Sequence, residues 1–283
     1  RTLTPAEEAA HRAKVEAARR EREAEEAKRK AEARERAHLL WAEAYPCTGH
    51  AYLTRKGITA NGARLHRESL VLPIRDTAGA VHSLQFIGAD GGKRYLTGGR
   101  IRGCYFGIGK PDGVLCIAEG FATGASIHEA TGYAVAVAFD AGNLQPTAKA
   151  LREKFPDMQL ILCADDDYRT DGNPGQTKAK ETAQAVGGLL VVPNFGPDRP
   201  EGATDFNDLH QAQGLAAVAR CIEAALTGTA IAPGIAQGMA TVPVLPSPAE
   251  KGNNPISGNS VAHDYGGGRF EVSPHGVFFI GTD

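Results

Sequence analysis

The chain has 283 residues, 42% of them hydrophobic and 23% charged, and a formal net charge of −2. This composition predicts a globular protein with room for two small domains, and the absence of any run of eighteen apolar residues excludes a membrane-spanning helix. The five cysteines are an odd set without CxxC spacing, which argues against a disulfide scaffold or a cysteine-based zinc module and favours a reducing cytoplasm.

Charge is divided unevenly along the chain. Residues 39–112 carry 10 basic and 5 acidic side chains, a net charge of +5, whereas residues 113–230 carry 8 basic and 15 acidic side chains, a net charge of −7. The segment before them has a net charge of +2 and the segment after them −2. A basic block directly beside an acidic block indicates that the two blocks serve different ligands.

Residues 5–37 consist almost entirely of Ala, Glu, Lys and Arg, which favour a helix, and many opposite charges lie three or four residues apart. Because only Val15 interrupts the polar run, the helix has no apolar stripe to bury. We therefore expect a charged, solvated helical linker rather than a nucleic-acid-binding arm, with the first packed element at residues 38–45. The sequence starts at Arg1 rather than Met, so we expect a segment of a longer protein.

Short strands and glycine turns follow. Residues 70–76 and 80–88 alternate between apolar and polar side chains around a turn at 77–79, which predicts a β-hairpin. A turn-rich piece at 88–99 and a short strand at 104–109 complete a small, basic α+β subdomain that we place at residues 38–112.

The pattern changes at residue 113. Continuous apolar runs at 114–118, 134–139 and 160–164 alternate with helical segments, and a last helix is expected over 205–226. This alternation predicts an α/β domain over 113–226, with a parallel sheet covered by helices on both faces. Residues 227–265 have the composition of a disordered linker, and residues 266–283 have the alternation of the first strands of a truncated further domain.

Carboxylates follow three of the predicted strands. Glu119 ends the first strand and Asp165 to Asp167 end the third. Asp205 and Asp208 come after the fourth strand and a Gly/Pro loop. Because ligands of an open parallel sheet bind at the carboxyl ends of its strands, these groups can share one rim.

The Asp165–Asp167 pair has a specific electrostatic requirement. In an extended segment both side chains point to the same side, and charges about 5 Å apart repel by roughly 3 kcal/mol at an effective dielectric of 20. A cation or an added proton relieves that repulsion. Hard oxygen ligands open to water favour Mg²⁺ held jointly with substrate phosphates. The alternative is that each acidic loop only caps a helix N-terminus.

Together, Glu119-Gly120, the Asp165-x-Asp167 pair and the DFND element at 205–208 resemble a Toprim domain. That domain is shared by bacterial-type primases, type IA and type II topoisomerases, and certain nucleases and recombination proteins. Residues 51–58, 70–88, 93–99 and 104–109 follow the order of the subdomain that precedes Toprim in bacterial-type primases. The chain therefore resembles the catalytic core of a phage, plasmid or genomic-island primase, a type often fused to a helicase.

The resemblance implies a DNA primase that makes short RNA primers on single-stranded DNA from nucleoside triphosphates, with Mg²⁺ or Mn²⁺. It implies catalytic roles for Glu119, Asp165 and Asp167, and metal ligation by these three with Asp205 and Asp208. Lys93 and Arg94 match residues that contact nucleotide or template, and Arg75, Arg100 and Arg102 are weaker members of the same basic surface. A replicative helicase, fused or separate, is the implied partner, without membrane attachment.

Two other function classes stay open. A Toprim nuclease or topoisomerase fragment would cleave DNA rather than polymerise nucleotides. A non-catalytic Toprim module would only bind nucleic acid, although its acidic set would then typically be eroded, and here the set is intact.

Overall fold

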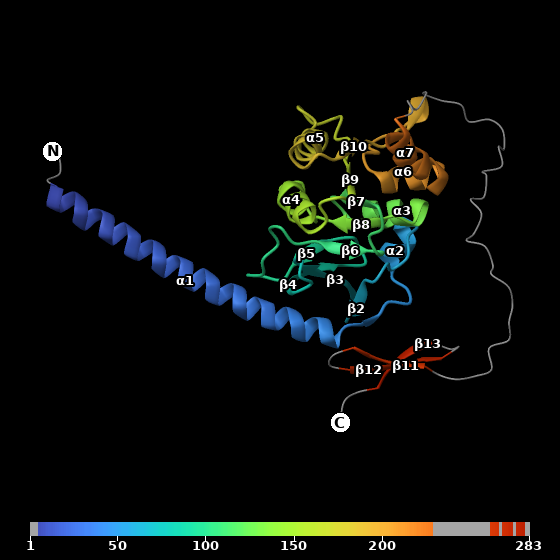
Figure 1. Cartoon of the computed structure of the whole chain (residues 1–283). Helices are drawn as coiled ribbons and strands as arrows, with labels where there is room; N and C mark the ends of the chain where they lie inside the picture. The colour runs from blue at the N-terminus through green and yellow to red at the C-terminus, as the bar shows by residue number, and fades with distance from the viewer. Residues whose placement is uncertain (1–4, 229–260, 266–267, 274–275, 281–283) are drawn as a thin grey trace, which may run out of the picture. The chain divides into compact units, whose positions relative to one another are not determined.

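The structure is a computed structural model that describes residues 5–228, 261–265, 268–273 and 276–280 (Figure 1). The chain forms two compact units, Arg1–Ile235 and Ala236–Asp283. Within the described ranges, no helix combines the length and the apolar character that crossing a bilayer requires. Most of the predicted linker, residues 229–260, lies outside the described residues.

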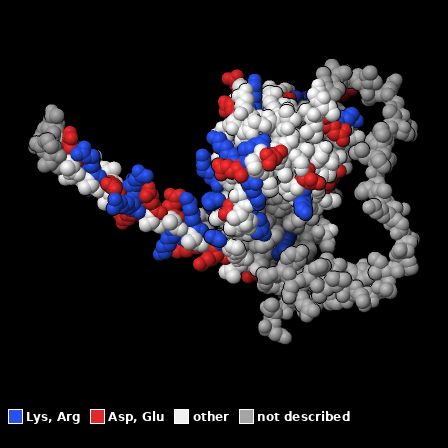
Figure 2. All heavy atoms as spheres, viewed as in Figure 1, with Lys and Arg blue, Asp and Glu red and all other residues white. Residues whose placement is uncertain are grey.

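One uninterrupted helix, α1 (Pro5–Glu43), opens the first unit. Ion pairs one turn apart, such as Arg19–Glu23 at 2.7 Å, follow its exposed length, and Figure 2 shows the two signs of charge mixed along it. Near its C-terminal end, however, Ala33 and Ala37 are only 2% and 0% exposed. The prediction that residues 5–37 have no packed face is therefore wrong for this end of the helix, because small alanine side chains let its backbone approach a sheet.

The basic subdomain is an antiparallel five-stranded sheet with one short helix. Its elements are β1 (Tyr45–Pro46), α2 (Ala51–Lys56), β2 (Arg64–His66), β3 (Ser69–Arg75), β4 (Val81–Ile87) and β5 (Lys93–Tyr95), and the strands lie in this order across the sheet. The predicted hairpin is confirmed as β3–β4. Side chains of one sheet face, such as Val71 and Leu84, pack with Ala37 of α1, and those of the other face, such as Leu72 and Ile74, join the core of the following domain.

The second part of the first unit is the predicted α/β sandwich. Its sheet has the order β10-β9-β7-β8-β6, with parallel strands β7 (Val114–Ala118), β8 (Ala134–Val137), β9 (Gln159–Cys163) and β10 (Leu189–Val191). The helices α3 (Phe121–Thr131), α6 (Phe206–Gln213) and α7 (Leu215–Thr227) pack on one face. The helices α4 (Leu144–Lys154) and α5 (Pro174–Val186) pack on the other, as Figure 1 shows. The fold class is confirmed.

Two details differ from the expectation. Strand β6 (Phe106–Ile108) was expected in the basic subdomain, but it pairs antiparallel with β8 at the edge of the α/β sheet. The helix expected over 205–226 is two helices, because Gly214 adopts a φ of 79° that ends α6 and starts α7. A short 3₁₀ turn, η1 (Gly196–Asp198), lies before α6.

The second unit contains an antiparallel sheet of β11 (Val261–Tyr265), β12 (Gly268–Ser273) and β13 (Gly276–Ile280). The last two strands lie where strand-like alternation was predicted. Strand β11 occupies the last five residues of the predicted linker, which is a correction to that boundary: residues 261–265 pair with β12 rather than remaining unstructured.

Candidate active site

The carboxyl ends of β7 and β9 and the start of α6 bring Glu119, Asp165 and Asp205 into electrostatic contact. Loss of hydration on burial, followed by the charges of Asp205 and Glu119, raises the pKa of Asp165 to about 8. Asp167 adds to the same shift. Glu119, Asp165, Asp167 and Asp205 thus form one group of interacting carboxylates, the acidic rim, and Asp208 acts on Asp205 at its edge.

Asp165 has a carboxylate oxygen that the protein leaves without a partner. Its Oδ1 atom is buried and has no hydrogen-bond partner within the part of the chain that the structure describes. A Cβ atom on Gly175, at the start of α5, would lie 2.8 Å from the Asp165 carbonyl oxygen and 2.9 Å from Asp167 Oδ2. A glycine at this position is what allows α5 to begin against the loop that carries the two carboxylates.

Asp167 points toward the first turn of α5. Its Oδ2 accepts a hydrogen bond from the Gly175 N–H at 3.1 Å, and its own N–H donates to Asn173 Oδ1 at 2.9 Å. One carboxylate oxygen is thus held by a helix N-terminus, as the capping alternative predicted. The other, Oδ1, receives no hydrogen bond within the described residues.

Glu119 follows β7 directly. Burial, then the charges of Asp140 and Asp167, raise the pKa of Glu119, while Lys93 and Lys178 lower it. Its carboxyl group therefore lies among charges of both signs and binds a proton more tightly than an exposed glutamate does.

Asp205 and Asp208 form a capping box at the start of α6. The Asp208 N–H donates to Asp205 Oδ1 at 2.8 Å, and Asp208 Oδ2 accepts from the Thr204 N–H at 2.8 Å. Asp205 Oδ2 also accepts from the Thr123 hydroxyl at 3.2 Å. Burial, followed by the charge of Asp208, raises the pKa of Asp205. The structure gives Asp208 a helix-capping role, and its ligation of a metal stays a prediction.

Lys93 is a residue of the basic subdomain that lies close to the carboxylates of this rim. Its Nζ lies 3.9 Å from the position that a Cβ atom would occupy on Gly120, and its charge lowers the pKa of both Glu119 and Asp165. Tyr95, two residues along β5, donates its hydroxyl hydrogen to the Phe139 carbonyl oxygen at 3.3 Å. Since alternate residues of a strand face opposite sides, Lys93 and Tyr95 face the acidic rim and Arg94 faces away from it.

The other predicted basic residues make internal contacts. Arg75 donates to the Gly79 carbonyl oxygen at 2.9 Å and lies over the Trp41 ring, 5.8 Å from its centroid. Arg100 donates to Cys104 Sγ at 3.3 Å and lies 4.0 Å from Asp76. Arg102 is exposed. A shared nucleic-acid surface of Arg94, Arg75, Arg100 and Arg102 therefore remains a prediction, and only Lys93 of the set acts on the acidic rim.

Sequence reasoning missed three charged residues of this site. Asp140 follows β8 and raises the pKa of Glu119, so the same strand-end rule would have found it. Lys178 of α5 lowers the pKa of Glu119, and Lys56 at the end of α2 lies 4.0 Å from Asp208 Oδ1. No sequence signal marks either lysine, because each reaches the rim only through tertiary packing.

The donor set fits a divalent metal in one particular way. Within the residues that the structure describes, no three His, Cys, Asp or Glu side chains lie close enough to hold a metal ion alone. Mg²⁺ does not need such a cage, because it keeps several waters and binds through one or two carboxylates plus substrate phosphates. The unpartnered Asp165 Oδ1 and the neighbouring Asp167 provide that minimal pair.

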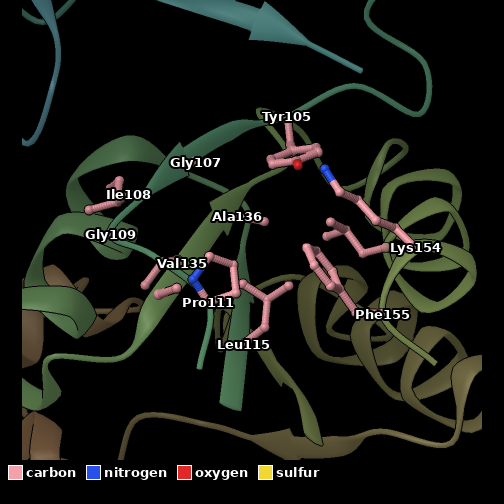
Figure 3. A pocket seen from close by; sticks show the side chains of 12 residues that line it. Tyr105, Gly107, Ile108, Gly109, Pro111, Leu115, Val135, Ala136, Lys154 and Phe155 are labelled. Atoms are coloured by element: carbon pink, nitrogen blue, oxygen red, sulfur yellow. The ribbon is translucent and has the colours of Figure 1, made fainter. Parts of the chain in front are cut away.

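A hollow elsewhere in the molecule does not share this chemistry. Figure 3 shows a cavity of about 150 Å³ beside β6 and β8, with Tyr105, Leu115 and Phe155 among its lining residues. No Asp or Glu lines it, and Lys154 at its edge donates to the Thr77 carbonyl oxygen. The site of interest is the charged rim rather than this apolar hollow.

The chain is similar in sequence to a known domain family and to two curated proteins. The Toprim domain family matches residues 114–216. Two Escherichia coli proteins named DNA primase TraC are 40% and 42% identical over 158 residues; these cover 52% of this chain, but only 15% and 11% of those proteins.

Among solved structures, the primase fragment of the bacteriophage T7 primase-helicase protein has a TM-score of 0.46 at 19% identity, over 60% of this chain and 73% of that one. The DnaG primase catalytic domain bound to single-stranded DNA has a TM-score of 0.40 at 19% identity, over 71% of each chain. The chain thus spans a small part of the curated relatives that it matches, and its residues 114–216 match the Toprim domain family.

Proposed function

We propose that this chain is the catalytic core of a DNA primase, which joins nucleoside triphosphates into short RNA primers on a single-stranded DNA template with Mg²⁺ or Mn²⁺. The supporting observation is that Lys93 of the basic subdomain lies close enough to Glu119 and Asp165 of the acidic rim for its charge to lower the pKa of both. Polymerisation needs both halves in one place, because carboxylates hold cations and basic side chains hold phosphates.

Asp165 and Asp167 are the residues that would hold the metal, with Asp205 and Glu119 beside them and Asp208 as the weakest candidate. A bound divalent ion would supply charge neutralisation at the phosphate oxygens and at the attacking oxygen. Glu119, Asp165 and Asp167 follow strand ends and cap no part of α6, so their removal should leave the fold intact.

The chain's own residues account for the rest of the step. The primer's 3′-oxygen forms a bond to the α-phosphorus while the bond to the bridging oxygen breaks, and pyrophosphate leaves. Glu119, whose pKa is raised, is suited to accept the proton of the 3′-hydroxyl. Lys93 and Lys178 neutralise the negative charge that grows on the leaving pyrophosphate.

Template binding and cellular context are part of the same proposal. We propose that the template is gripped through its phosphates without sequence readout, by Lys93 and by Arg94, Arg75, Arg100 and Arg102. A plasmid or phage origin and a replicative helicase, fused or separate, are the expected context.

The test is incubation of the purified chain with single-stranded DNA, the four ribonucleoside triphosphates and Mg²⁺ or Mn²⁺. We expect short RNA products that require template, triphosphates and metal together. DNA scission instead would assign a nuclease or topoisomerase-type activity, and binding without either product would assign a non-catalytic module. Each of these outcomes contradicts the primase proposal. The Asp157→Asn variant is the matched control, because it changes an exposed carboxylate that precedes the amino end of β9, whereas Asp165 follows the carboxyl end.

A further inference from the structure

The middle residue of the acidic triplet has a different environment from its neighbours. Asp166 Oδ2 accepts a hydrogen bond from Arg199 Nη1 at 2.6 Å, and its Oδ1 accepts from Asn173 Nδ2 at 2.6 Å. The side chains of Asp166 and Arg199 are 18% and 21% exposed. Both carboxylate oxygens of Asp166 are therefore engaged, while Asp165 Oδ1 has no partner among the described residues and Asp167 is bound through Oδ2 alone.

Arg199 also holds a second loop. Its Nε and Nη2 donate to the Ala203 carbonyl oxygen at 2.8 and 2.6 Å, and Nη2 donates to the Asp166 carbonyl oxygen at 3.1 Å. In addition, the Asp166 N–H donates to the Thr204 carbonyl oxygen at 2.8 Å. One guanidinium thus joins the loop of Asp165 and Asp167 to the loop that leads, two residues after Ala203, to Asp205.

The guanidinium is itself held in place. Its Cζ lies 3.9 Å from the centroid of the Tyr168 ring and 4.8 Å from that of Phe195. A planar group that contacts two aromatic rings and has its donors in a fixed fork has little freedom to move. The separation of the two acidic loops is therefore set by a rigid element rather than by flexible side chains.

We propose that Arg199 is a positioning residue that fixes Asp165 and Asp167 relative to Asp205 by clamping Asp166 and Ala203 together. The inference rests on the proposed function, since it concerns the carboxylates that would hold the metal. Arg199 touches neither substrate nor metal in this scheme and acts through the backbone of the two loops. Partners that orient metal ligands in this way are typically worth about 10- to 100-fold in metal affinity.

The chain offers a matched control. Arg169 pairs with Glu201 at 3.0 Å, so it also links the two loops, but its side chain is 57% exposed and that of Glu201 is 85% exposed. An exposed pair of this kind contributes little. If any bridge between the loops sufficed, Arg169→Ala would behave like Arg199→Met.

The experiment measures Mn²⁺ binding to the full chain in the absence of nucleotide. Electron paramagnetic resonance follows the binding, because the signal of free Mn²⁺ weakens as the ion binds. We expect about tenfold weaker binding in Arg199→Met and Asp166→Asn, and the double variant should be no weaker than either single one, because both changes open the same clamp. Arg199→Lys keeps the charge but loses the fork, so it should not restore binding. Arg169→Ala should bind as the unchanged protein does.

Amide hydrogen exchange of the metal-free protein gives a second readout. The amides at positions 166 and 167 should exchange faster in Arg199→Met and Asp166→Asn than in the unchanged protein. In Arg169→Ala their exchange rates should be the same as in the unchanged protein. Should Arg199→Met fail to fold, the nearly isosteric Asp166→Asn carries both tests.

The outcomes separate the two proposals. If Asp165→Asn loses Mn²⁺ binding while Arg199→Met and Asp166→Asn match Arg169→Ala, the clamp is overturned and the metal site stands. If the unchanged chain binds no Mn²⁺, or Asp165→Asn binds it equally well, the proposed site fails and the clamp fails with it.

Discussion

The two acidic loops of the α/β domain contain the same residue type and use it differently. In the loop after β9, Asp165 Oδ1 is buried without a partner among the described residues. At the start of α6, Asp205 and Asp208 accept hydrogen bonds from each other's backbone and from Thr204, which satisfies the first turn of the helix. The backbone N–H groups within reach, rather than the number of carboxylates, decide which loop is free to bind a cation.

The same difference exists within the triplet Asp165 to Asp167. Asp166 is held by Arg199 and Asn173, whereas Asp165 carries a pKa raised to about 8. Such a shift indicates a carboxyl group whose charged form the protein leaves poorly stabilised, and a cation would stabilise it.

The largest expected effect is a loss of primer synthesis when the loop after β9 is changed. Asp165→Asn and Asp167→Asn should lower primer synthesis by at least about 100-fold, because they remove the minimal pair of ligands, while circular dichroism should show an unchanged fold. Product yield is measured at saturating template. Near-normal yield from both variants would contradict the assignment of this loop as the metal site.

The next largest effect is on nucleic-acid binding by Lys93 of β5. Lys93→Ala should weaken binding of single-stranded DNA or nucleotide and reduce the slope of log affinity against log salt concentration by about 0.7, the value for one phosphate contact. Lys110→Ala changes an exposed lysine outside the proposed phosphate-binding set; it is the control and should leave the slope unchanged. The measurement is a salt titration of DNA binding for both variants. Equal changes in the two variants would show that Lys93 makes no phosphate contact of its own.

The pKa of Asp165 predicts how pH acts on stability. Its folded pKa, about 8, lies above the unfolded value near 4, so the native state holds the extra proton between these values. The free energy of unfolding of the metal-free protein should therefore fall as pH rises from 4 to 8. Asp165→Asn removes this dependence and should be more stable above pH 8, by about 2 kcal/mol once partial contact with water is allowed for.

Chemical denaturation at pH 5 and pH 8.5 measures this effect, with Asp157→Asn as the control. A variant Asp165→Asn that is less stable than the unchanged protein at pH 8.5 would mean that its carboxylate is stabilised in the fold, contrary to the unpartnered oxygen.

The smallest effect belongs to the capping loop. Asp208→Asn should lower the free energy of unfolding by about 1 kcal/mol, since one half of the capping box is weakened, and should reduce primer synthesis far less than Asp165→Asn does. Thermal melts beside product yields measure both. If Asp208→Asn abolished synthesis without a change in melting temperature, a ligand role would replace the capping role.

The features that sequence predicted are those that follow from local patterns. Continuous apolar runs located the strands β7, β8 and β9, and the strand-end rule placed Glu119 and Asp165 at one rim. The same pattern could not reveal that Asp166 is engaged by Arg199, because 33 residues separate the two and only the fold brings them together.

The errors have equally physical causes. Alanine was counted as a helix former and not as a packing surface, so the buried end of α1 at Ala33 and Ala37 was missed. The single helix expected over 205–226 overlooked the left-handed φ of Gly214. Capping at Asp208 was weighed only as a general alternative, since a DFND sequence is compatible with both roles.

Strand β6 and the residue before it connect the basic subdomain to the α/β domain, which the sequence pattern separates. Strand β6 follows the basic subdomain along the chain, yet it is a strand of the α/β sheet, and Tyr105 just before it bridges to Arg75 of β3. The two parts are thus hydrogen-bonded to each other through continuous backbone rather than joined by a hinge. Lys93 and the carboxylates consequently keep a fixed spacing without any closing motion, and we expect the two parts to melt in a single cooperative transition.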